Sequence, residues 1–249
     1  MPLDRVDIQQ FVFQGALPYN NRLFFIQHLM PYVFMTPQCE GKQVLEIGSG
    51  DGFGSYYISR KAQYVVEVDN NLSSYNSLKK YIETYKKKNI YFIGADGIHL
   101  PFKARRFDSV VTCQVIEHIP EQSLLSFLQE ICRVLKDRGT CLISTLNVEN
   151  NIKNYLTYEK FFQHYKEFDR QSLEGILRKV FPKVEVRGLN VTLKHRFFRR
   201  FKKWGFLKYD VCGYNPVRDF YHNVAPNDFR VSQKSTKSSL DLVAICKKG

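Results

Sequence analysis

One stretch of the chain decides the fold: residues 44–52 have the sequence Val44-Leu45-Glu46-Ile47-Gly48-Ser49-Gly50-Asp51-Gly52, in which a short apolar segment runs into three alternating glycines. The apolar segment is typical of a buried strand, and residues 53–61 follow it with helical spacing. Glycines between a strand and a helix allow the backbone to approach a ligand closely. We therefore expect a ligand-binding loop where the first strand of an α/β sheet ends.

Strands and helices alternate through most of the chain. Apolar and β-branched segments predict six further strands, at residues 64–68, 90–93, 107–113, 140–145, 184–186 and 240–245. Helical spacing predicts further helices at residues 72–87, 121–135 and 170–181. This alternation implies right-handed βαβ units in a parallel, doubly wound α/β sheet, whose ligands bind beyond the carboxyl ends of the strands.

Length and composition indicate a single domain over residues 1–249, since 44% of the residues are hydrophobic and 24% are charged. Residues 1–40 are expected to form an N-terminal helical cap, with a helix at 19–35. Residues 188–230 are basic, aromatic and irregular in pattern. We interpret this last segment as an insertion on the main domain.

Nothing in the sequence indicates secretion, a membrane span or a metal. The N-terminus lacks a basic segment followed by an apolar one, and no apolar run approaches the roughly 20 residues of a transmembrane helix. The six cysteines form no Cys-x-x-Cys pairs, which favours reduced thiols over a zinc site. We therefore expect a cytoplasmic protein with no metal in its site.

The glycine pattern distinguishes between two classes of cofactor. Dinucleotide sites prefer Gly-x-Gly-x-x-Gly, with the pyrophosphate at the helix N-terminus, whereas the third position of that motif is Phe53 here. Glu46 and Asp51 would place carboxylates where they repel a pyrophosphate. The same carboxylates suit S-adenosylmethionine, which carries an ammonium, a sulfonium and a single carboxylate. The loop therefore favours S-adenosylmethionine as the cofactor.

Two aspartates follow the next two strands. Asp69 ends the predicted strand at 64–68, where a carboxylate can accept hydrogen bonds from both ribose hydroxyls. Asp96 follows the strand at 90–93, where an acid can accept a hydrogen bond from an adenine amino group. Either aspartate alone could equally cap a helix. The loop and both acids, each at a strand end and in this order, together predict an S-adenosylmethionine site.

A specific set of motifs runs from Lys42 to Asn147. It consists of Val44 to Gly52, Val66-Glu67-Val68-Asp69, Gly94-Ala95-Asp96, Leu100-Pro101-Phe102, Phe107-Asp108-Ser109-Val110-Val111, Glu117-His118-Ile119-Pro120 and Arg133-Val134-Leu135-Lys136. Together these segments resemble class I S-adenosylmethionine-dependent methyltransferases of the UbiE-like, methyltransferase type 11 group. The resemblance implies a Rossmann-like, mostly parallel sheet of seven strands, with an antiparallel last strand and helices on both faces.

The same resemblance assigns parts of the cofactor to residues. It places the backbone near Gln114 beside the sulfonium. The other residues that it implies for the cofactor run from the methionine end through the ribose to the adenine: Glu46, Gly48, Ser49, Gly50, Asp69, Asn70, Asp96 and Gly97. All of them lie in the loop or at the ends of the next strands.

A narrower resemblance concerns the acceptor. Ser144-Thr145-Leu146-Asn147 and the later His164-Tyr165-Lys166-Glu167-Phe168 are similar to an STPN … H-x-x-EF pattern of methyltransferases often placed in surface-polysaccharide and glycolipid biosynthesis. Leu146 stands where that pattern has Pro, and Phe162-Gln163 stands where it has Asn-Pro. The resemblance implies methyl transfer to an oxygen of a small molecule or of a lipid-linked saccharide.

Three residues are candidates for moving a proton. A hydroxyl acceptor needs a general base, and His118 follows the fourth strand near the expected position of the methyl group. His164 and Glu167 are three residues apart and would share one face of a helical turn. The alternative is structural: Glu117 and His118 would cap or orient the next helix, and His164 and Glu167 would tie down the segment after the fifth strand.

The formal net charge of +13 suggests an anionic partner, and residues 194–208 contain seven Lys or Arg and no acid. Apolar side chains recur in this region at helical spacing on one face: Leu193, Phe197, Phe201 and Trp204. A basic amphipathic helix over 193–204 is typical of peripheral contact with a membrane, here its inner surface. The alternatives are packing of the aromatic residues on the domain, or a groove for nucleic acid.

Three classes of function follow from the sequence. The leading interpretation is a methyltransferase that modifies an oxygen of a small molecule or a lipid-linked saccharide. The second is an RNA methyltransferase, which only the positive charge favours. The third is a non-catalytic S-adenosylmethionine-binding protein, and the intact loop with both strand-end acids counts against it.

Overall fold

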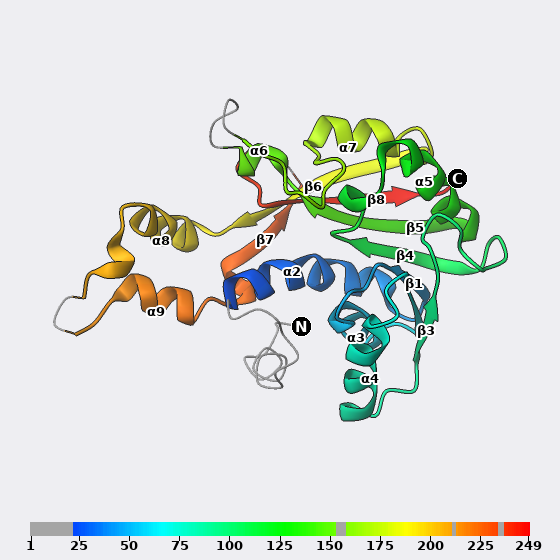
Figure 1. Ribbon diagram of the computed structural model, residues 1–249, viewed down its shortest axis with the longest axis horizontal. Coiled ribbons are helices and arrows are strands. Elements are labelled where there is room, and N and C mark those ends of the chain that lie inside the picture. Colours follow the sequence, from blue (N-terminus) through cyan, green and yellow to red (C-terminus); the bar gives the residue numbers. More distant parts are fainter. Residues whose placement is uncertain (1–21, 153–157, 211–212, 234–236) are drawn as a thin grey trace.

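The computed structural model describes residues 22–152, 158–210, 213–233 and 237–249. Its centre is one eight-stranded sheet in the order β3-β2-β1-β4-β5-β8-β6-β7 (Figure 1). The strands are β1 (Gln43–Ile47), β2 (Tyr64–Asp69), β3 (Ile90–Gly94), β4 (Phe107–Cys113), β5 (Leu135–Leu146), β6 (Lys183–Val191), β7 (Phe229–Ser232) and β8 (Asp241–Lys247). Strands β1 to β5 pair in parallel, and β8 runs antiparallel to both β5 and β6.

The mostly parallel sheet with an antiparallel last strand is confirmed, but the sheet has eight strands where seven were predicted. The additional strand, β7, pairs antiparallel with the far end of β6, with Val191 opposite Phe229. Its four residues alternate between apolar and polar for only two cycles, which is too short a pattern to indicate a strand. Both ends of the predicted insertion at 188–230 are therefore strands of the sheet.

Helices cover both faces of the sheet (Figure 1). One face carries α2 (Arg22–Met35), α3 (Phe53–Ser59) and α4 (Ser74–Thr84), and the other carries α5 (Leu124–Val134) and α7 (Arg170–Leu177). Alternate strand residues supply the two cores, because successive side chains of a strand point to opposite faces. In β1, for example, Val44 packs on the α2 side and Leu45 on the α5 side.

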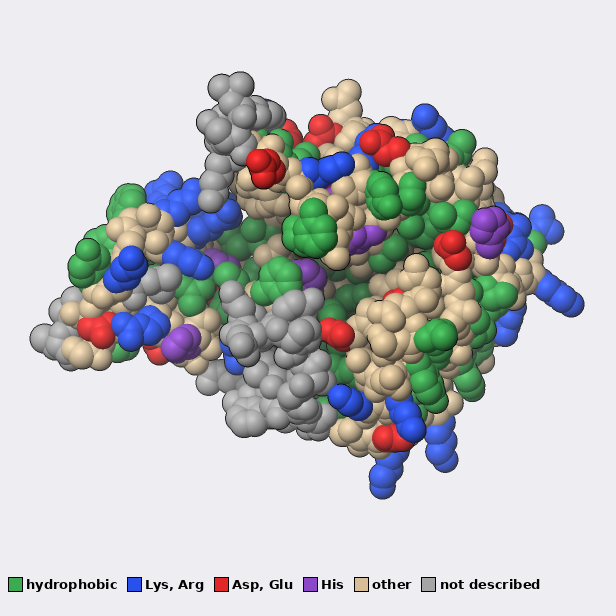
Figure 2. All heavy atoms as spheres, in the orientation of Figure 1, with side chains coloured by type: hydrophobic (Ala, Val, Ile, Leu, Met, Phe, Trp, Pro, Cys, Tyr) green, Lys and Arg blue, Asp and Glu red, His purple; other side chains and the backbone are tan. Residues whose placement is uncertain are grey.

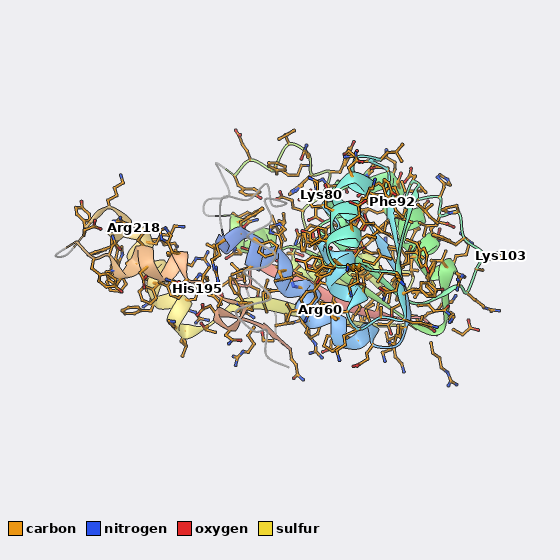
Figure 3. All side chains as sticks on the ribbon, turned by 90° about the horizontal axis from the view of Figure 1, so that it is seen from below. Arg60, Lys80, Phe92, Lys103, His195 and Arg218 are labelled. Carbon is orange, nitrogen blue, oxygen red and sulfur yellow. The ribbon has the colours of Figure 1, made fainter. Side chains whose placement is uncertain are left out.

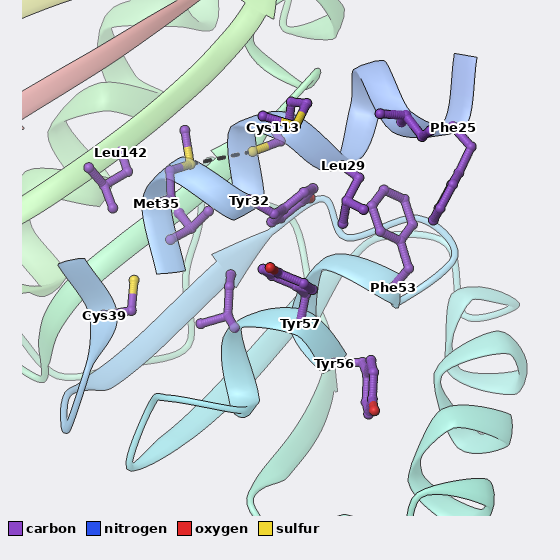
Figure 4. Close-up of a cluster of buried hydrophobic side chains, with 14 of the residues drawn as sticks. Phe25, Leu29, Tyr32, Met35, Cys39, Phe53, Tyr56, Tyr57, Cys113 and Leu142 are labelled. Atoms are coloured by element: carbon purple, nitrogen blue, oxygen red, sulfur yellow. Dashed lines mark hydrogen bonds between the residues drawn. The ribbon is translucent and has the colours of Figure 1, made fainter. Parts of the chain in front are cut away.

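Helix α2 is fixed to the sheet by an aromatic and sulfur-rich core (Figure 4). The ring of Phe53, the first residue of α3, lies 5.6 Å from Phe25 and 5.3 Å from Tyr32, both on α2. At the end of the helix, Met35 Sδ is 3.7 Å from Cys113 Sγ on β4. Prolines often end helices, yet α2 continues through Pro31 to Met35. These contacts hold α2 against the loop that follows β1.

An arm connects β6 to β7 and projects from the end of the sheet (Figure 1). It consists of α8 (Leu193–Lys203), η4 (Phe206–Lys208), α9 (Pro216–His222) and η5 (Pro226–Asp228). Phe198 of α8 stacks on Phe220 of α9 at 4.3 Å, and the His195 ring lies 5.2 Å from the same phenylalanine. In Figure 3, His195 and Arg218 mark this arm, and Lys103 lies at the opposite end of the molecule.

Short helical segments complete the described chain: η1 (Thr36–Cys39), η2 (Ile116–His118), η3 (Glu121–Ser123) and α6 (Val148–Asn151). No helix in the described part of the chain is long and apolar enough to cross a membrane. Within the same residues, all five cysteines are free thiols, and no group of three or more His, Cys, Asp or Glu side chains is placed to hold a metal ion.

Candidate active site

The glycine-rich loop turns sharply between β1 and α3. Gly48, Gly50 and Gly52 all have left-handed backbone conformations, with φ of 72°, 55° and 77°, which other residues adopt only with strain. A side chain at Gly48 would also place its Cβ 2.4 Å from Val115 Cγ2. At Gly50, by contrast, a Cβ would meet nothing within 4 Å. The loop therefore packs tightly on one side and leaves open space at Gly50.

The strand-end acid Asp69 is joined directly to this loop. Its Oδ2 accepts a hydrogen bond of 3.1 Å from the Gly50 backbone N–H, and its Oδ1 accepts one of 2.8 Å from Asn71. Its carboxylate remains partly exposed, and the next residue, Asn70, is exposed. Asp69 thus fixes the loop while retaining lone pairs for a ligand.

Asp96 lies at the adjacent strand end. Asp69 is opposite Gly94 in the β2–β3 register, so both acids lie at the same edge of the sheet. The exposed Asp96 carboxylate accepts a hydrogen bond of 2.9 Å from the Ile98 N–H. Gly97 is confined by packing, because a Cβ there would lie 3.0 Å from Ile47 and Phe127. The order of loop, Asp69 and Asp96 at successive strand ends is the one that the sequence predicts.

A hollow of about 970 Å³ opens beside the loop, where β1, β4 and β8 meet α2 and the segment after α6. We call it the central hollow; Figure 2 shows a recess at the middle of the molecule. The predicted site residues that line it are Gly48, Ser49, Gly50, Gln114, His118, His164 and Glu167. The predicted residues that do not line it are Glu46, Asp69, Asn70, Asp96 and Gly97.

Gln114 lies in the wall of the central hollow directly after β4. It has φ of 56°, in the left-handed region, and its N–H donates a hydrogen bond of 2.8 Å to Ser144 O. A non-glycine residue held in this conformation costs roughly 1–3 kcal/mol, and such residues cluster at functional sites. The strained backbone at Gln114 therefore supports the predicted position beside the reacting atoms.

Glu46 lies underneath the loop. It is fully buried; its Oε2 accepts a hydrogen bond from Ser55, and the Tyr32 side chain lies beside the carboxylate. Burial raises the pKa of Glu46 to about 7. Its neighbour in the β1–β2 register is Glu67, whose carboxylate is also buried and lies near Ser49 and Ser55. Burial, with Glu46 nearby, raises the pKa of Glu67 to about 8.

Two other buried acids, unlike Glu46 and Glu67, line the central hollow, and the sequence did not identify them as site residues. Glu117 is completely buried, with its carboxylate near Thr145 and the Leu146 backbone. Burial raises its pKa to about 7. Asp241 begins β8 and accepts a hydrogen bond of 3.2 Å from Gln27 Nε2 on α2; burial raises its pKa to about 7. An acid inside an otherwise apolar strand was the only signal for Asp241.

The alternative in which Glu117 caps the next helix is wrong, because neither η3 nor α5 has a side-chain cap. The backbone carbonyl of Glu117 instead accepts hydrogen bonds of 2.8 Å from the Tyr165 N–H and 3.3 Å from the Lys166 N–H. Glu117 therefore ties the segment around residue 165 to the end of β4 through its backbone.

His164 and Glu167 form a close pair, but they do not lie on a helical turn. The chain makes a tight turn at residues 162–163 and is then irregular, with the His164 N–H bonded to Phe161 O at 2.9 Å. His164 Nδ1 lies 2.7 Å from Glu167 Oε1, and the two side chains are only 9% and 5% exposed. The turn thus achieves the contact that a helix was expected to provide.

Tyr158 extends this pair and was missed from the sequence. Its hydroxyl donates a hydrogen bond to Glu167 Oε2, and the Phe161 N–H donates one of 3.3 Å to Oε1. Burial would raise the pKa of Glu167, but the hydrogen bonds from Tyr158, His164 and the Phe161 backbone lower it overall. Glu167 is therefore held as a carboxylate against the imidazole.

His118 lies next to His164, with ring centroids 4.9 Å apart. Its Nδ1 is 3.1 Å from Gln163 O, and the residue is otherwise exposed at the rim of the central hollow. Burial of part of the ring lowers the pKa of His118, and His164 adds to this effect. Of the two histidines, only His164 contacts a carboxylate that can orient it.

The residues present fit S-adenosylmethionine. The open space at Gly50 admits a ligand, and Ser49 and Gln114 line the same wall. The buried carboxylate of Glu117 lines the hollow, and those of Glu46 and Glu67 lie behind the loop. Buried acids favour a neighbouring cation such as an ammonium or a sulfonium. Asp69 and Asp96 continue along the sheet edge toward the expected ribose and adenine.

Comparisons with known proteins agree with this geometry. Residues 45–143 match the family model described as "Methyltransferase domain". A Mycobacterium tuberculosis protein named "Probable S-adenosylmethionine-dependent methyltransferase Rv3030" is 31% identical over 124 residues, which are 50% of this chain and 43% of that protein. The "Ubiquinone biosynthesis O-methyltransferase" of Coxiella burnetii is 28% identical over 127 residues, 51% of this chain and 52% of that protein. The match thus spans about half the length of these relatives.

Solved structures share the fold. The YcgJ protein of Bacillus subtilis superposes with a TM-score of 0.59 at 16% identity, covering 89% of this chain and all of that one. The N-methyltransferase NodS of Bradyrhizobium japonicum gives 0.56 at 10% identity, covering 92% and 98%. Residues 45–143 therefore match a methyltransferase domain, for which S-adenosylmethionine is the cofactor. The resemblance drawn from the motifs is confirmed.

Proposed function

We propose that this protein transfers a methyl group from S-adenosylmethionine to a hydroxyl oxygen of a small-molecule or lipid-linked saccharide acceptor. One observation carries the proposal: the His164–Glu167 pair and the glycine loop line the same central hollow. A histidine oriented by a carboxylate is the arrangement that a general base requires. A hydroxyl acceptor needs such a base, because its proton must leave as the new carbon–oxygen bond forms.

Three side chains have separate roles in the proposed reaction: His164, Glu167 and Tyr158. S-adenosylmethionine, when bound, supplies a methyl group on a good leaving group, so positioning provides much of the catalysis. Glu167 holds Nδ1 of His164, which leaves Nε2 to accept the proton of the acceptor hydroxyl. The ionised Glu167 then stabilises the imidazolium, and Tyr158 keeps Glu167 in place.

The remaining walls of the hollow suit an organic acceptor. Phe24 and His28 of α2 and Phe161 line the hollow together with the site residues. Aromatic rings of this kind provide apolar surface with a few polar groups, as in most small-molecule sites. The relative from Coxiella burnetii, named as an O-methyltransferase, supports oxygen as the accepting atom.

Transfer of labelled methyl from S-adenosylmethionine into fractionated extract, followed by purification of the labelled acceptor, tests this proposal. His164→Ala and Glu167→Gln should each lower kcat by about 10²-fold or more, because general-base catalysis contributes roughly that much. Affinity for S-adenosylhomocysteine should be unchanged in both. The matched control is His99→Ala, an exposed histidine outside the central hollow, which should keep full turnover.

Two results would contradict the proposal. Cofactor binding with no methyl transfer into any fraction would favour a non-catalytic S-adenosylmethionine-binding protein. Full turnover in both His118→Ala and His164→Ala would remove histidine as the base. Labelling of RNA in place of small or lipid-linked acceptors would assign the protein to the RNA methyltransferases instead.

A further inference from the structure

Helix α8 has three different faces. One face, with His195 and Phe198, packs on α9. The second carries the apolar residues found from the sequence, and they do not pack on the domain: Leu193 is 79% exposed, Trp204 67% and Phe197 56%. Unlike Leu193, the aromatic residues of this face contact one another, with the Phe201 ring 4.6 Å from Phe197 and 5.4 Å from Trp204.

The exposed apolar surface continues beyond the helix. Phe206 lies 5.4 Å from Phe201, and Tyr209 lies 6.4 Å from Phe206; both are exposed. We call these residues the apolar ridge; all are exposed except the half-buried Phe201: Leu193, Phe197, Phe201, Trp204, Phe206 and Tyr209. Contiguous exposed apolar surface of this kind marks a site of interaction with a partner or a membrane.

The third face of α8 forms one wall of a basic cleft of about 640 Å³ next to α6. Arg196, Arg199, Arg200 and Lys203 line it from α8, at the i, i+3, i+4 and i+7 spacing of one helical face. Lys237 lines it from the other side. Figure 2 shows Lys and Arg side chains gathered over this part of the arm.

Little negative charge balances the cleft. Its one lining acid, Glu149, lies 3.8 Å from Lys237. Arg199 donates a hydrogen bond of 3.3 Å to the Asn150 side chain. Among the residues that the structure places, no carboxylate forms an ion pair with Arg196, Arg200 or Lys203. Several cations on one face without counter-charges favour an anionic ligand.

From these two adjacent surfaces we infer that the arm docks on an anionic phospholipid bilayer. The apolar ridge lies at the boundary between headgroups and acyl chains, and the basic cleft binds lipid phosphates. Apolar and aromatic residues on one side of a helix, with Lys and Arg beside them, are what interfacial helices require. This inference stands independently of the proposed reaction.

Two other partners fit the surfaces less well. A second copy of this chain, packed symmetrically, would bring the two rows of uncompensated cations together. Single-stranded RNA binds through base stacking on aromatic rings, yet the most exposed member of the ridge is the aliphatic Leu193. An anionic bilayer satisfies the ridge and the cleft at once.

The docking surface is also close to the central hollow. Asn150 lines the basic cleft and the next residue, Asn151, lines the central hollow, so the short helix α6 separates the two. If the proposed function holds, an acceptor anchored in the bilayer would have a short path to the base.

Vesicle binding by the full chain tests the inference, and the protein carries its own probe. Trp204 is the single tryptophan of the sequence and belongs to the ridge. Vesicles of phosphatidylcholine with about 30 mol % phosphatidylglycerol should co-sediment the protein and shift the Trp204 emission to shorter wavelength. Binding to pure phosphatidylcholine vesicles should be weaker by about tenfold or more, because the basic cleft then lacks its ligand.

Matched variants separate the two surfaces. Leu193→Glu should weaken vesicle binding by about tenfold or more, whereas the same change at the exposed Leu125 on α5 should not. The triple change Arg196→Gln, Arg200→Gln and Lys203→Gln should also weaken vesicle binding by about tenfold or more. Its control removes three exposed lysines elsewhere and reaches the same net charge: Lys80→Gln, Lys103→Gln and Lys183→Gln.

Binding of S-adenosylhomocysteine, measured in parallel, should be the same for all of these variants and shows that they are folded. The inference is overturned if the wild type does not bind the anionic vesicles, or binds with unchanged Trp204 emission. Equal loss of vesicle binding in Leu193→Glu and its Leu125 control also overturns it. Equal loss in the triple variant of the basic cleft and its lysine control does the same. So does RNA binding, or self-association lost in Leu193→Glu, without vesicle binding.

Discussion

Single residues around the loop show how burial tunes this site. Glu46 and Glu67 lie behind the glycine loop, and Glu117 and Asp241 lie in the hollow, all with pKa values raised mainly by burial. A cationic ligand next to these carboxylates would favour their ionised forms. The site is thus prepared for positive charge even though the chain as a whole is strongly basic.

Glu67 makes stability depend on pH. Its folded-state pKa of about 8 lies well above its value in the unfolded chain. Between those two values the folded protein holds a proton that the unfolded chain has released, so the free energy of unfolding falls as pH rises and levels off above about pH 8. For an isolated group the fall is about 1.4 kcal/mol per pH unit.

Glu67→Gln should therefore flatten the curve. The free energy of unfolding of the variant, minus that of the wild type, should rise by about 1 kcal/mol or more from pH 5.5 to pH 8.5. Urea denaturation at both pH values measures this, with the exposed Glu83→Gln as the control. Parallel wild-type and variant curves across this range would show that Glu67 is not a buried acid.

Some site residues could be identified from local sequence and others could not. The glycines at 48, 50 and 52 and the strand-end acids Asp69 and Asp96 have backbone roles that depend on their immediate neighbours. Asp241 acquires its role only when distant segments meet, in its hydrogen bond from Gln27, and Tyr158 only when the irregular segment that follows it folds back to Glu167. One sequence without an alignment carries no local signal for such pairs.

At the scale of elements, the loop between β1 and α3 is the most constrained part of the chain. Gly48→Ala should weaken S-adenosylhomocysteine binding at least tenfold, because the left-handed backbone alone costs roughly 1–2 kcal/mol. The added methyl group would also meet Val115 at 2.4 Å. Calorimetric titration of the purified variant measures the affinity.

Gly175→Ala is the control for that experiment. Gly175 lies in α7, and a Cβ there would meet nothing within 4 Å. Alanine should raise stability by about 0.5–1 kcal/mol, as expected for glycine in a helix, and leave the affinity for S-adenosylhomocysteine unchanged. Equal affinities in all three proteins would mean that the loop does not hold the cofactor.

Elements with strong periodicity were predicted well, and short or irregular ones were not. The helix expected at 121–135 appears as η3 and α5, and the strand at 107–113 has the predicted bounds. The four-residue strand β7 was missed, and the helical turn expected at His164 is an irregular turn held by the Glu117 carbonyl. In both places tertiary contacts, more than local pattern, decide the backbone.

At the scale of the whole molecule, the sheet brings three sites to neighbouring positions. The carboxyl ends of β1 to β4 carry the residues expected to bind the cofactor, the segment after α6 supplies the proposed base, and the arm between β6 and β7 presents the apolar ridge and basic cleft. The sequence indicated the amphipathic character of α8. The orientation of α8 could not be derived from the sequence, because α8 packs on α9 through a face that the sequence pattern does not distinguish.

Ligand-linked stability tests the central claim, cofactor binding by the loop and the strand-end acids, most directly. S-adenosylhomocysteine at about 100 times its Kd should stabilise the native protein by about 2.7 kcal/mol and raise its Tm. Asp69→Ala should abolish that rise, and Asp137→Ala, an exposed acid paired with Arg105, should leave it unchanged. No rise in Tm for the wild type, or an equal rise in Asp69→Ala, would contradict the account.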